Sequence, residues 1–214
     1  MNQVIFARLV SLVIGYLFGC ILTAEIVARR TAGKKAAEVG ETGNPGMANI
    51  MASLGFVPGI LTLAGDLGKC ILPGIISFLL FPGQGWIIVL YAGLGCTLGH
   101  DFPFWRRFRG GKGVATTSMA IVLYRFWPGL AANIIGMLVV FAAKYLCIGG
   151  PVIPLSFTLM MVLMREWEAA VLSGILSLLS VWSHGKAILG IREGKTKKTD
   201  VLKAIKRKRD SGRK

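Results

Sequence analysis

Long apolar runs separated by short turn segments are the feature that most limits how this chain can fold. A membrane-spanning helix needs about 20 predominantly apolar residues, and fewer where it begins inside protein. The mean hydropathy is +0.64, and 54% of the residues are hydrophobic while 16% are charged. A water-soluble core has no room for so much apolar surface, so the sequence predicts an all-α, polytopic transmembrane helical bundle of about seven spans. The expected spans are residues 4–28, 57–81, 86–100, 113–127, 129–146, 148–164 and 167–184.

The distribution of lysine and arginine predicts how the bundle is oriented, because cytoplasmic segments carry an excess of both. With seven spans, only Arg8, Arg125 and Arg165 fall outside, and Lys69 lies within a span. All other basic residues fall on the inner side. The N-terminus is therefore expected outside and the C-terminus in the cytoplasm. We expect residues 1–190 to form one integral membrane domain and residues 191–214 to form a basic cytoplasmic tail.

The net charge of +15 indicates contact with anionic lipid and anionic substrates rather than with nucleic acid, for which the chain has no motif. The cysteines lie in apolar runs without the spacing of a metal site, and His100 and His184 are far apart. We therefore predict no metal site and no cofactor. The oligomeric state is not predicted.

The segment 99–117 combines His100, Arg109, Lys112 and the glycines Gly110, Gly111 and Gly113 between two apolar runs. Glycines allow main-chain amides to approach an anion closely, and a helix beginning at Val114 would direct its positive end to the same place. The segment therefore predicts a phosphate site. A basic, membrane-facing loop with flexible glycines is the alternative.

Two other segments carry polar residues of interest. Residues 42–49 form a turn sequence in which Asn44 and Asn49 could bind a phosphate or a hydroxyl, or in which Thr42 or Asn44 only caps a following short helix over 48–54. Asp66 and Lys69 lie three residues apart inside a predicted span. Ionisable groups at that depth usually face a polar interior, so the two residues form either part of a site or a structural ion pair.

Three separated blocks of this chain resemble the bacterial acyl-phosphate:glycerol-3-phosphate acyltransferases (the PlsY family). The blocks are Thr42-Gly43-Asn44-Pro45-Gly46-Met47-Ala48-Asn49, the segment from Gly99-His100 through Gly110-Gly111-Lys112-Gly113-Val114-Ala115-Thr116, and His184 with Gly194, with Asp66 and Lys69 between the first two. The chain departs from the family pattern at Cys20-Ile21-Leu22, where a Ser-x-Pro is expected, at the missing arginine before the first block, where Glu41 is an extra residue, and at Ala187, where an asparagine is expected.

The resemblance implies an acyltransferase of phospholipid biosynthesis that moves a fatty acyl group from acyl phosphate to the 1-hydroxyl of sn-glycerol 3-phosphate, giving lysophosphatidic acid and phosphate. It implies a multi-pass protein of the bacterial plasma membrane, in contact with lipid, with its active site facing the cytoplasm. The implied catalytic residues are Lys112, His100 and His184. The implied substrate- and phosphate-binding residues are Thr42, Gly43, Asn44, Gly46, Asn49, Asp66, Lys69, Arg109, Gly110, Gly111, Gly113, Thr116 and Gly194.

The group that removes the hydroxyl proton is left open between His100 and a substrate phosphate oxygen. Two other functions also stay open. One is a transporter or channel for a phosphorylated or lipid anion, which would equally use Asp66, Lys69 and a basic vestibule. The other is a catalytically silent paralogue that binds lipid precursors.

Overall fold

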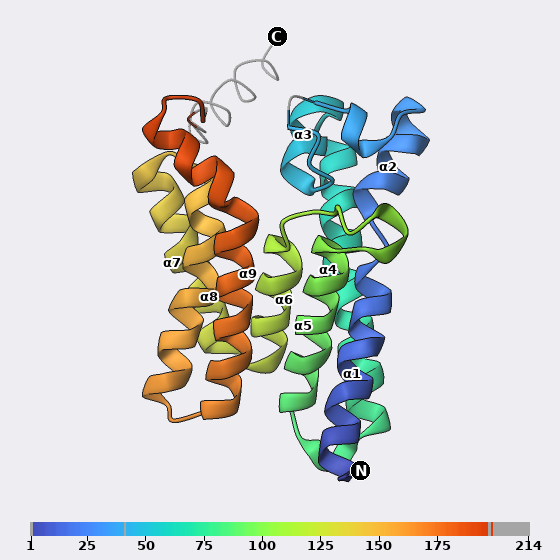
Figure 1. Cartoon of the computed structure of the whole chain (residues 1–214), viewed down its shortest axis with the longest axis vertical. Coiled ribbons are helices and arrows are strands. Elements are labelled where there is room, and N and C mark those ends of the chain that lie inside the picture. Colours follow the sequence, from blue (N-terminus) through green and yellow to red (C-terminus); the bar gives the residue numbers. More distant parts are fainter. Residues whose placement is uncertain (1, 41, 197, 199–214) are drawn as a thin grey trace.

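Helices are the only regular secondary structure in residues 2–40, 42–196 and 198, the part of the chain that the computed structural model describes (Figure 1). The α-helices are α1 (Gln3–Gly19), α2 (Thr23–Ala32), α3 (Met47–Leu54), α4 (Phe56–Leu80), α5 (Ile87–Asp101), α6 (Val114–Tyr124), α7 (Phe126–Ala143), α8 (Leu146–Leu163) and α9 (Trp167–Arg192). Short 3-10 turns cover Ala36–Glu38, Pro82–Gln84 and Phe104–Arg106. The predicted all-α membrane bundle is confirmed.

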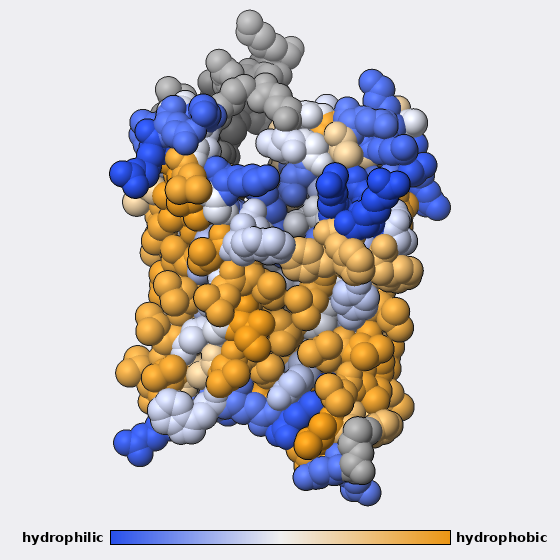
Figure 2. Space-filling view, in the orientation of Figure 1, coloured by the Kyte–Doolittle hydropathy of each residue, from blue (hydrophilic) through white to orange (hydrophobic). Residues whose placement is uncertain are grey.

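Six helical segments are long and apolar enough to cross a membrane: Gln3–Ala32, Phe56–Leu80, Ile87–Arg106, Phe126–Ala143, Leu146–Leu163 and Trp167–Arg192. Their outward side chains form an apolar belt, with hydrophilic side chains gathered at the two ends (Figure 2). Leu163 and Leu178 are 83% and 72% exposed, as expected for residues that face lipid. The molecule is therefore a multi-pass membrane protein.

The fourth expected span, 113–127, is instead the 11-residue helix α6. It is short because the loop before it, residues 102–113, folds back toward the bundle, so that α6 begins well below the end of the molecule (Figure 1). From there α6 runs to the end at which α1 begins. The first expected span also differs, because the apolar run 4–28 is interrupted between α1 and α2. Which end faces the cytoplasm stays a prediction.

Glycines allow α1 and α5 to pack with their backbones in contact. A Cβ atom added to Gly95 would lie 2.0 Å from the carbonyl oxygen of Leu12, and one added to Gly15 would lie 1.9 Å from that of Ala92. Small residues at helix contacts in membranes serve this purpose, because close backbones gain the dispersion energy that lipid cannot supply. This contact holds α5, and the loop that follows it, against α1.

We expect Gly95→Ala to lower the free energy of unfolding by about 1–3 kcal/mol, because the added methyl group has no space beside Leu12. Gly174→Ala in α9 is the matched control, since its nearest neighbour would be 4.0 Å away. Thermal unfolding in detergent, followed by tryptophan fluorescence, measures both variants. Equal melting temperatures for the two would show that the α1–α5 contact is not closely packed.

The break between α1 and α2 is held by two side chains from elsewhere in the chain. The Trp105 indole N–H donates to the carbonyl oxygen of Cys20 at 2.8 Å, and Lys69 Nζ donates to that of Ile21 at 2.9 Å. Main-chain carbonyls freed by a helix break at membrane depth must find partners inside the protein. The departure at Cys20-Ile21-Leu22 therefore lies beside the predicted site.

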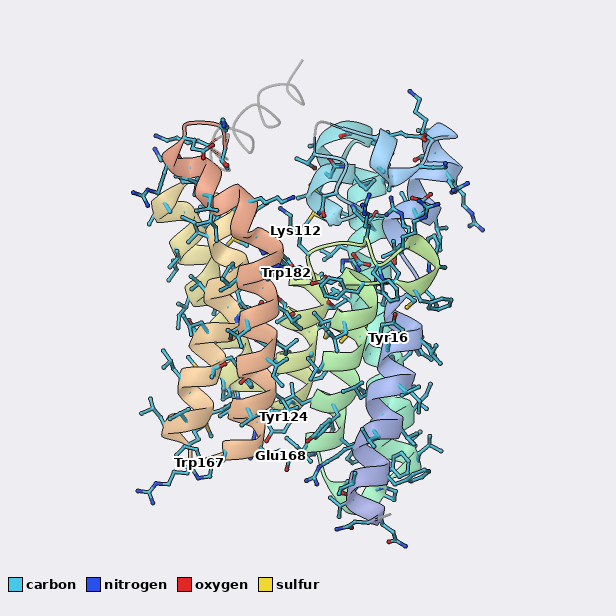
Figure 3. All side chains as sticks on the ribbon, in the orientation of Figure 1. Tyr16, Lys112, Tyr124, Trp167, Glu168 and Trp182 are labelled. Carbon is cyan, nitrogen blue, oxygen red and sulfur yellow. The ribbon has the colours of Figure 1, made fainter. Side chains whose placement is uncertain are left out.

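At the end where α1 begins, acidic residues before and within the first turn of α9 tie the bundle together (Figure 3). Glu168 accepts hydrogen bonds from Arg8 at 2.7 Å and from Tyr91 at 2.9 Å. Glu166 accepts from Tyr124 and Arg125. These contacts join α9 to α1, α5 and α6 at the end opposite to the predicted site.

Candidate active site

The loop 102–113 is fixed to the end of α5 by its own glycine amides. The N–H of Gly110 donates to the carbonyl oxygen of Asp101 and that of Gly111 to the carbonyl oxygen of His100, both at 2.9 Å. These two amides are therefore not available to an anion, which corrects the expectation that the amides of Gly110 and Gly111 help to bind phosphate. The amides of Lys112 and Gly113 donate no hydrogen bond among those of the described residues.

Free amides continue into the first turn of α6. The first residues of a helix have no main-chain partner for their N–H groups, and Gly113 directly precedes Val114 in a left-handed conformation with φ +62°. Thr116 Oγ1 donates to the carbonyl oxygen of Gly113 at 3.0 Å and accepts from Thr97 Oγ1 at 3.1 Å. Thr116 thus shapes this turn from within and is fully buried.

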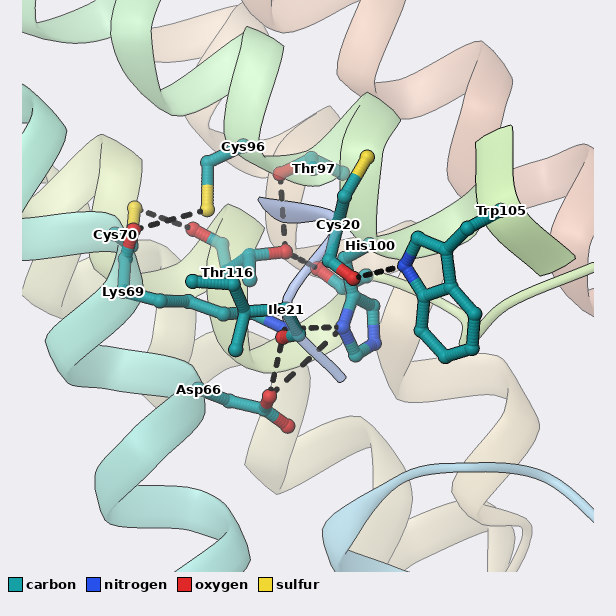
Figure 4. A network of polar contacts seen from close by, with 11 residues as sticks. Cys20, Ile21, Asp66, Lys69, Cys70, Cys96, Thr97, His100, Trp105 and Thr116 are labelled. Carbon is teal, nitrogen blue, oxygen red and sulfur yellow. Dashed lines mark hydrogen bonds and ion pairs between the residues drawn. The ribbon is translucent and has the colours of Figure 1, made fainter. Parts of the chain in front are cut away.

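Asp66, Lys69 and His100 form one buried cluster between α4 and α5 (Figure 4). Lys69 Nζ lies 2.9 Å from Asp66 Oδ1 and 2.7 Å from His100 Nδ1. The three residues are 2%, 5% and 4% exposed. The geometry agrees with both interpretations of Asp66 and Lys69. The two side chains form an ion pair, and Lys69 also contacts His100, a predicted catalytic residue.

The cluster also sets the protonation of His100. A lysine ammonium can only donate, so His100 Nδ1 accepts from Lys69 and the ring proton is on Nε2. That nitrogen faces the glycine loop, because a Cβ atom added to Gly111 would lie 2.0 Å from it. His100 thus presents an N–H donor toward the loop rather than a proton acceptor.

Lys112 and His184 are distant in the sequence but lie close enough in the fold for the charge of one to affect the other. The half-buried Lys112 points toward α9 (Figure 3) and its charge acts electrostatically on His184 and Cys147. His184 is 3% exposed and packs against Gly150 of α8. Its Nδ1 donates to the carbonyl oxygen of Ser180 at 2.9 Å, since a carbonyl can only accept, and this leaves Nε2 of the neutral ring without a proton.

The first block lies at the same end of the molecule as the loop 102–113 (Figure 1). The Asn49 side chain is used inside the block: Nδ2 donates to the carbonyl oxygen of Val39 at 2.7 Å and Oδ1 accepts from Thr42 at 2.8 Å. Asn44 is half-buried and keeps its side-chain amide free of protein hydrogen bonds among the described residues. Of the two asparagines, Asn44 is thus the better placed to bind a ligand.

Local geometry accounts for the glycines of this block and corrects one expectation. Gly43 has φ +58°, a left-handed conformation that favours glycine, and the helix α3 begins after Gly46. Neither Thr42 nor Asn44 caps α3. The N-cap residue is Gly46, and no side chain accepts a capping hydrogen bond from the first turn of the helix. The extra residue Glu41 lies outside the described residues.

Arg109 and Gly194 are among the predicted residues that do not contact the cluster of Asp66, Lys69 and His100. Arg109 is exposed on the loop, and Gly194 ends α9 in a left-handed conformation with φ +68° and open space around it. Beside Gly194, Thr196 Oγ1 donates to the carbonyl oxygen of Ala187, the position at which the asparagine is missing, at 2.6 Å. Most of the predicted basic tail lies outside the described residues.

The structure adds residues that the sequence did not single out. Asp101 is 4% exposed, follows His100 directly and accepts from Ser183 Oγ at 3.0 Å. Trp105 contacts the break between α1 and α2, and Thr97 contacts Thr116. The signal that could have revealed Asp101 is a carboxylate at the end of an apolar run. Within the described part of the chain, no three His, Cys, Asp or Glu side chains gather as metal ligands would.

An apolar groove of about 390 Å³ runs along the outside of the α1–α2 break beside the cluster. Its lining is mostly hydrophobic and is open to the lipid-facing side. The lining residues are Leu17, Cys20, Ile21, Leu22, Glu25, Ile26, Phe104 and Trp105.

The fold and the site together define a polytopic membrane protein with a candidate anion site at one end of its bundle. The chain matches the family model for glycerol-3-phosphate acyltransferase over residues 9–194. It therefore belongs to the glycerol-3-phosphate acyltransferase family, as its resemblance to the PlsY enzymes implied, and it is an acyltransferase.

Individual relatives agree along nearly the whole chain. It is 41% identical to glycerol-3-phosphate acyltransferase 1 of Lactobacillus johnsonii over 199 residues, covering 93% of this chain and 96% of the relative. It is 30% identical to the enzyme of Shouchella clausii over 195 residues, covering 87% and 95%. The fold is similar to the crystal structure of the integral membrane enzyme PlsY in its glycerol 3-phosphate form, with a TM-score of 0.81 at 24% identity, covering 92% of this chain and 98% of that one.

Proposed function

We propose that this chain transfers a fatty acyl group from acyl phosphate to the 1-hydroxyl of sn-glycerol 3-phosphate, at the cytoplasmic face of a bacterial plasma membrane. The products are lysophosphatidic acid and inorganic phosphate. The relatives are named as glycerol-3-phosphate acyltransferases, and the PlsY crystal structures are described as glycerol 3-phosphate and lysophosphatidic acid forms. The family match does not favour a transporter or a silent binding protein.

The observation that carries the proposal is the position of Lys112. It points from a loop anchored on His100 toward α9, the helix of His184 (Figure 3), and the free amides of Lys112, Gly113 and the first turn of α6 lie next to it. Positive charge and fixed amide dipoles at one place bind phosphate and stabilise the charge that a leaving phosphate develops. Acyl phosphate already has a good leaving group, so binding and alignment supply most of the catalysis.

The proposed reaction forms one carbon–oxygen bond, breaks another and moves one proton. The glycerol hydroxyl oxygen bonds to the acyl carbonyl carbon, and the bond from that carbon to the phosphate oxygen breaks, so that phosphate leaves with the electron pair. The hydroxyl proton goes to a phosphate oxygen. We favour phosphate over His100 as the base, because His100 Nδ1 is occupied by Lys69 and its Nε2 carries the proton. His100 would instead donate a hydrogen bond from Nε2.

The remaining contacts support parts of this arrangement. The segment that precedes α3 lies at the same end as the loop (Figure 1), and Asn44 in this segment offers a free side-chain amide for the glycerol 3-phosphate. The apolar groove beside Trp105 and the α1–α2 break offers a place for the acyl chain that needs no exit from the membrane. The phosphate groups would then lie at the polar end of the bundle while the chain stays in hydrocarbon.

The test is turnover of palmitoyl phosphate with glycerol 3-phosphate by the detergent-purified protein. We expect equal amounts of lysophosphatidic acid and inorganic phosphate, and no product when palmitoyl coenzyme A replaces palmitoyl phosphate. Turnover with the coenzyme A donor alone would assign a different donor. Absence of any product, in protein that shows a cooperative thermal transition, would contradict the proposed reaction.

A further inference from the structure

The candidate active site is divided between two parts of the molecule. His100 and the loop with Lys112 belong to the first part, α1 to α6, whereas His184 belongs to α9 in the second part, α7 to α9 (Figure 1). The reaction proposed above requires both parts to keep a fixed separation. A contact that sets this separation would control the rate without touching substrate.

Asp101 and Ser183 make such a contact. Each of them is the direct chain neighbour of a predicted catalytic histidine, His100 and His184. Ser183 Oγ donates to Asp101 Oδ2 at 3.0 Å, so the hydrogen bond joins the end of α5 to α9 at the chain neighbours of the two histidines. Asp101 is 4% exposed, which shields this hydrogen bond from competing water.

Asp101 also contacts the glycine loop. A Cβ atom added to Gly113 would lie 2.9 Å from Asp101 Oδ1 and 3.2 Å from Oδ2. The main-chain carbonyl of Asp101 accepts the amide of Gly110 at 2.9 Å. One residue thus contacts the loop through its backbone and side chain and contacts α9 through Ser183.

Other polar contacts between the two parts lie at the opposite end. These are the hydrogen bonds of Glu168 with Arg8 and Tyr91, and those of Glu166 with Tyr124 and Arg125. Among the side-chain hydrogen bonds of residues 2–40, 42–196 and 198, only Asp101–Ser183 joins the parts at the loop end. Next to it the rings of Phe102 and Trp182 lie 5.1 Å apart.

We propose that Asp101 is a positioning residue which, through Ser183, holds His184 at a fixed distance from Lys112 and the glycine loop. The proposal rests on the acyl transfer described above, because the distance between the two parts affects the rate only if the site between them catalyses that reaction. Without the hydrogen bond, α9 stays attached at the far end and moves at the loop end.

Kinetics of four variants test the role. We expect Ser183→Ala and Asp101→Ala each to lower kcat about 10-fold to 100-fold, because small misplacements of reacting groups have effects of this size. Asp101→Asn keeps a carbonyl oxygen that accepts from Ser183, so it should retain a rate close to that of the native protein. The double variant Asp101→Ala/Ser183→Ala should be no slower than either single variant.

Ser177→Ala is the matched control, because Ser177 is a buried serine of α9 whose hydrogen bonds stay within the second part. It should not change kcat. Two results would overturn the proposal: an Asp101→Asn variant as slow as Asp101→Ala, or single effects that multiply in the double variant.

A distance measurement tests the positioning role independently of the proposed acyl transfer. Spin labels at the exposed residues Arg107 and Lys186 report the spacing between the loop and α9 by pulsed electron resonance. We expect one narrow distance distribution in the native background and in Ser177→Ala, and a broadened one in Ser183→Ala. An unchanged distribution in Ser183→Ala would overturn the positioning role even if the native protein turned over a different donor.

Discussion

Lys112→Ala is expected to lower kcat/KM for palmitoyl phosphate and glycerol 3-phosphate by about 10²–10³-fold, the loss typical of removing one group that stabilises developing negative charge. Lys112 is the cation that the loop directs toward α9 (Figure 3), and the free amides of the loop and of α6 alone carry no full charge. Release of inorganic phosphate and formation of lysophosphatidic acid measure the effect. Lys112→Arg should restore only part of the rate, because a planar guanidinium differs from a compact ammonium in reach and geometry.

Lys144→Ala is the matched control, since it removes an exposed lysine that follows the last residue of α7. Its kcat/KM should equal that of the native protein. A Lys112→Ala variant with native kcat/KM would contradict the phosphate-site role of this loop and would return the segment to the alternative of a basic membrane-facing loop.

Gly111→Ala is expected to reduce turnover about 100-fold while the bundle stays folded, because the added methyl group would lie 2.0 Å from His100 Nε2. The ring has nowhere to move, since Lys69 contacts its other side at 2.7 Å and is itself held by Asp66 and the carbonyl oxygen of Ile21. The loop must therefore shift, and Lys112 shifts with it. Steady-state kinetics together with a thermal transition in detergent measure the two effects separately.

Gly68→Ala provides the comparison, because Gly68 precedes Lys69 in the chain and a Cβ atom there meets nothing within 4 Å. Its turnover should match that of the native protein. Full activity of Gly111→Ala would mean that His100 does not face the loop in the working enzyme, and the protonation assigned to His100 would fall with it.

The sequence predicted the segment 99–117, which contains the loop 102–113, as a phosphate site but did not predict the roles of its amides. Residue types alone place Gly110, Gly111, Lys112 and Gly113 in one phosphate-binding segment. The structure shows that the first two amides hold the loop to His100 and Asp101, which leaves the free donors at Lys112, Gly113 and the start of α6. Which amide finds a partner depends on how the loop folds back onto the end of α5. Residue types within the loop do not determine this fold, because the partners lie about ten residues earlier in the chain.

The same limit explains Asn49 and Asp101. Asn49 was a reasonable ligand-binding residue by type, yet its side chain is used by Val39 and Thr42 within its own block. Asp101 was not singled out from the sequence, yet its side chain joins α5 to α9. A polar side chain within a membrane bundle must find a partner, but the sequence does not say which one.

The sequence by itself determined that this chain is an all-α membrane protein and which short segments carry its chemistry. Partition of a helix into hydrocarbon depends on the residues of that helix alone, so the apolar runs were enough to predict the bundle. Only the tertiary structure decided that the first span is broken at Cys20-Ile21-Leu22, that α6 is short, and that Asp101 beside His100 is joined to Ser183 beside His184. These features depend on contacts between helices, such as the glycine contact of α1 with α5, and contacts between distant residues are fixed by packing rather than by local composition.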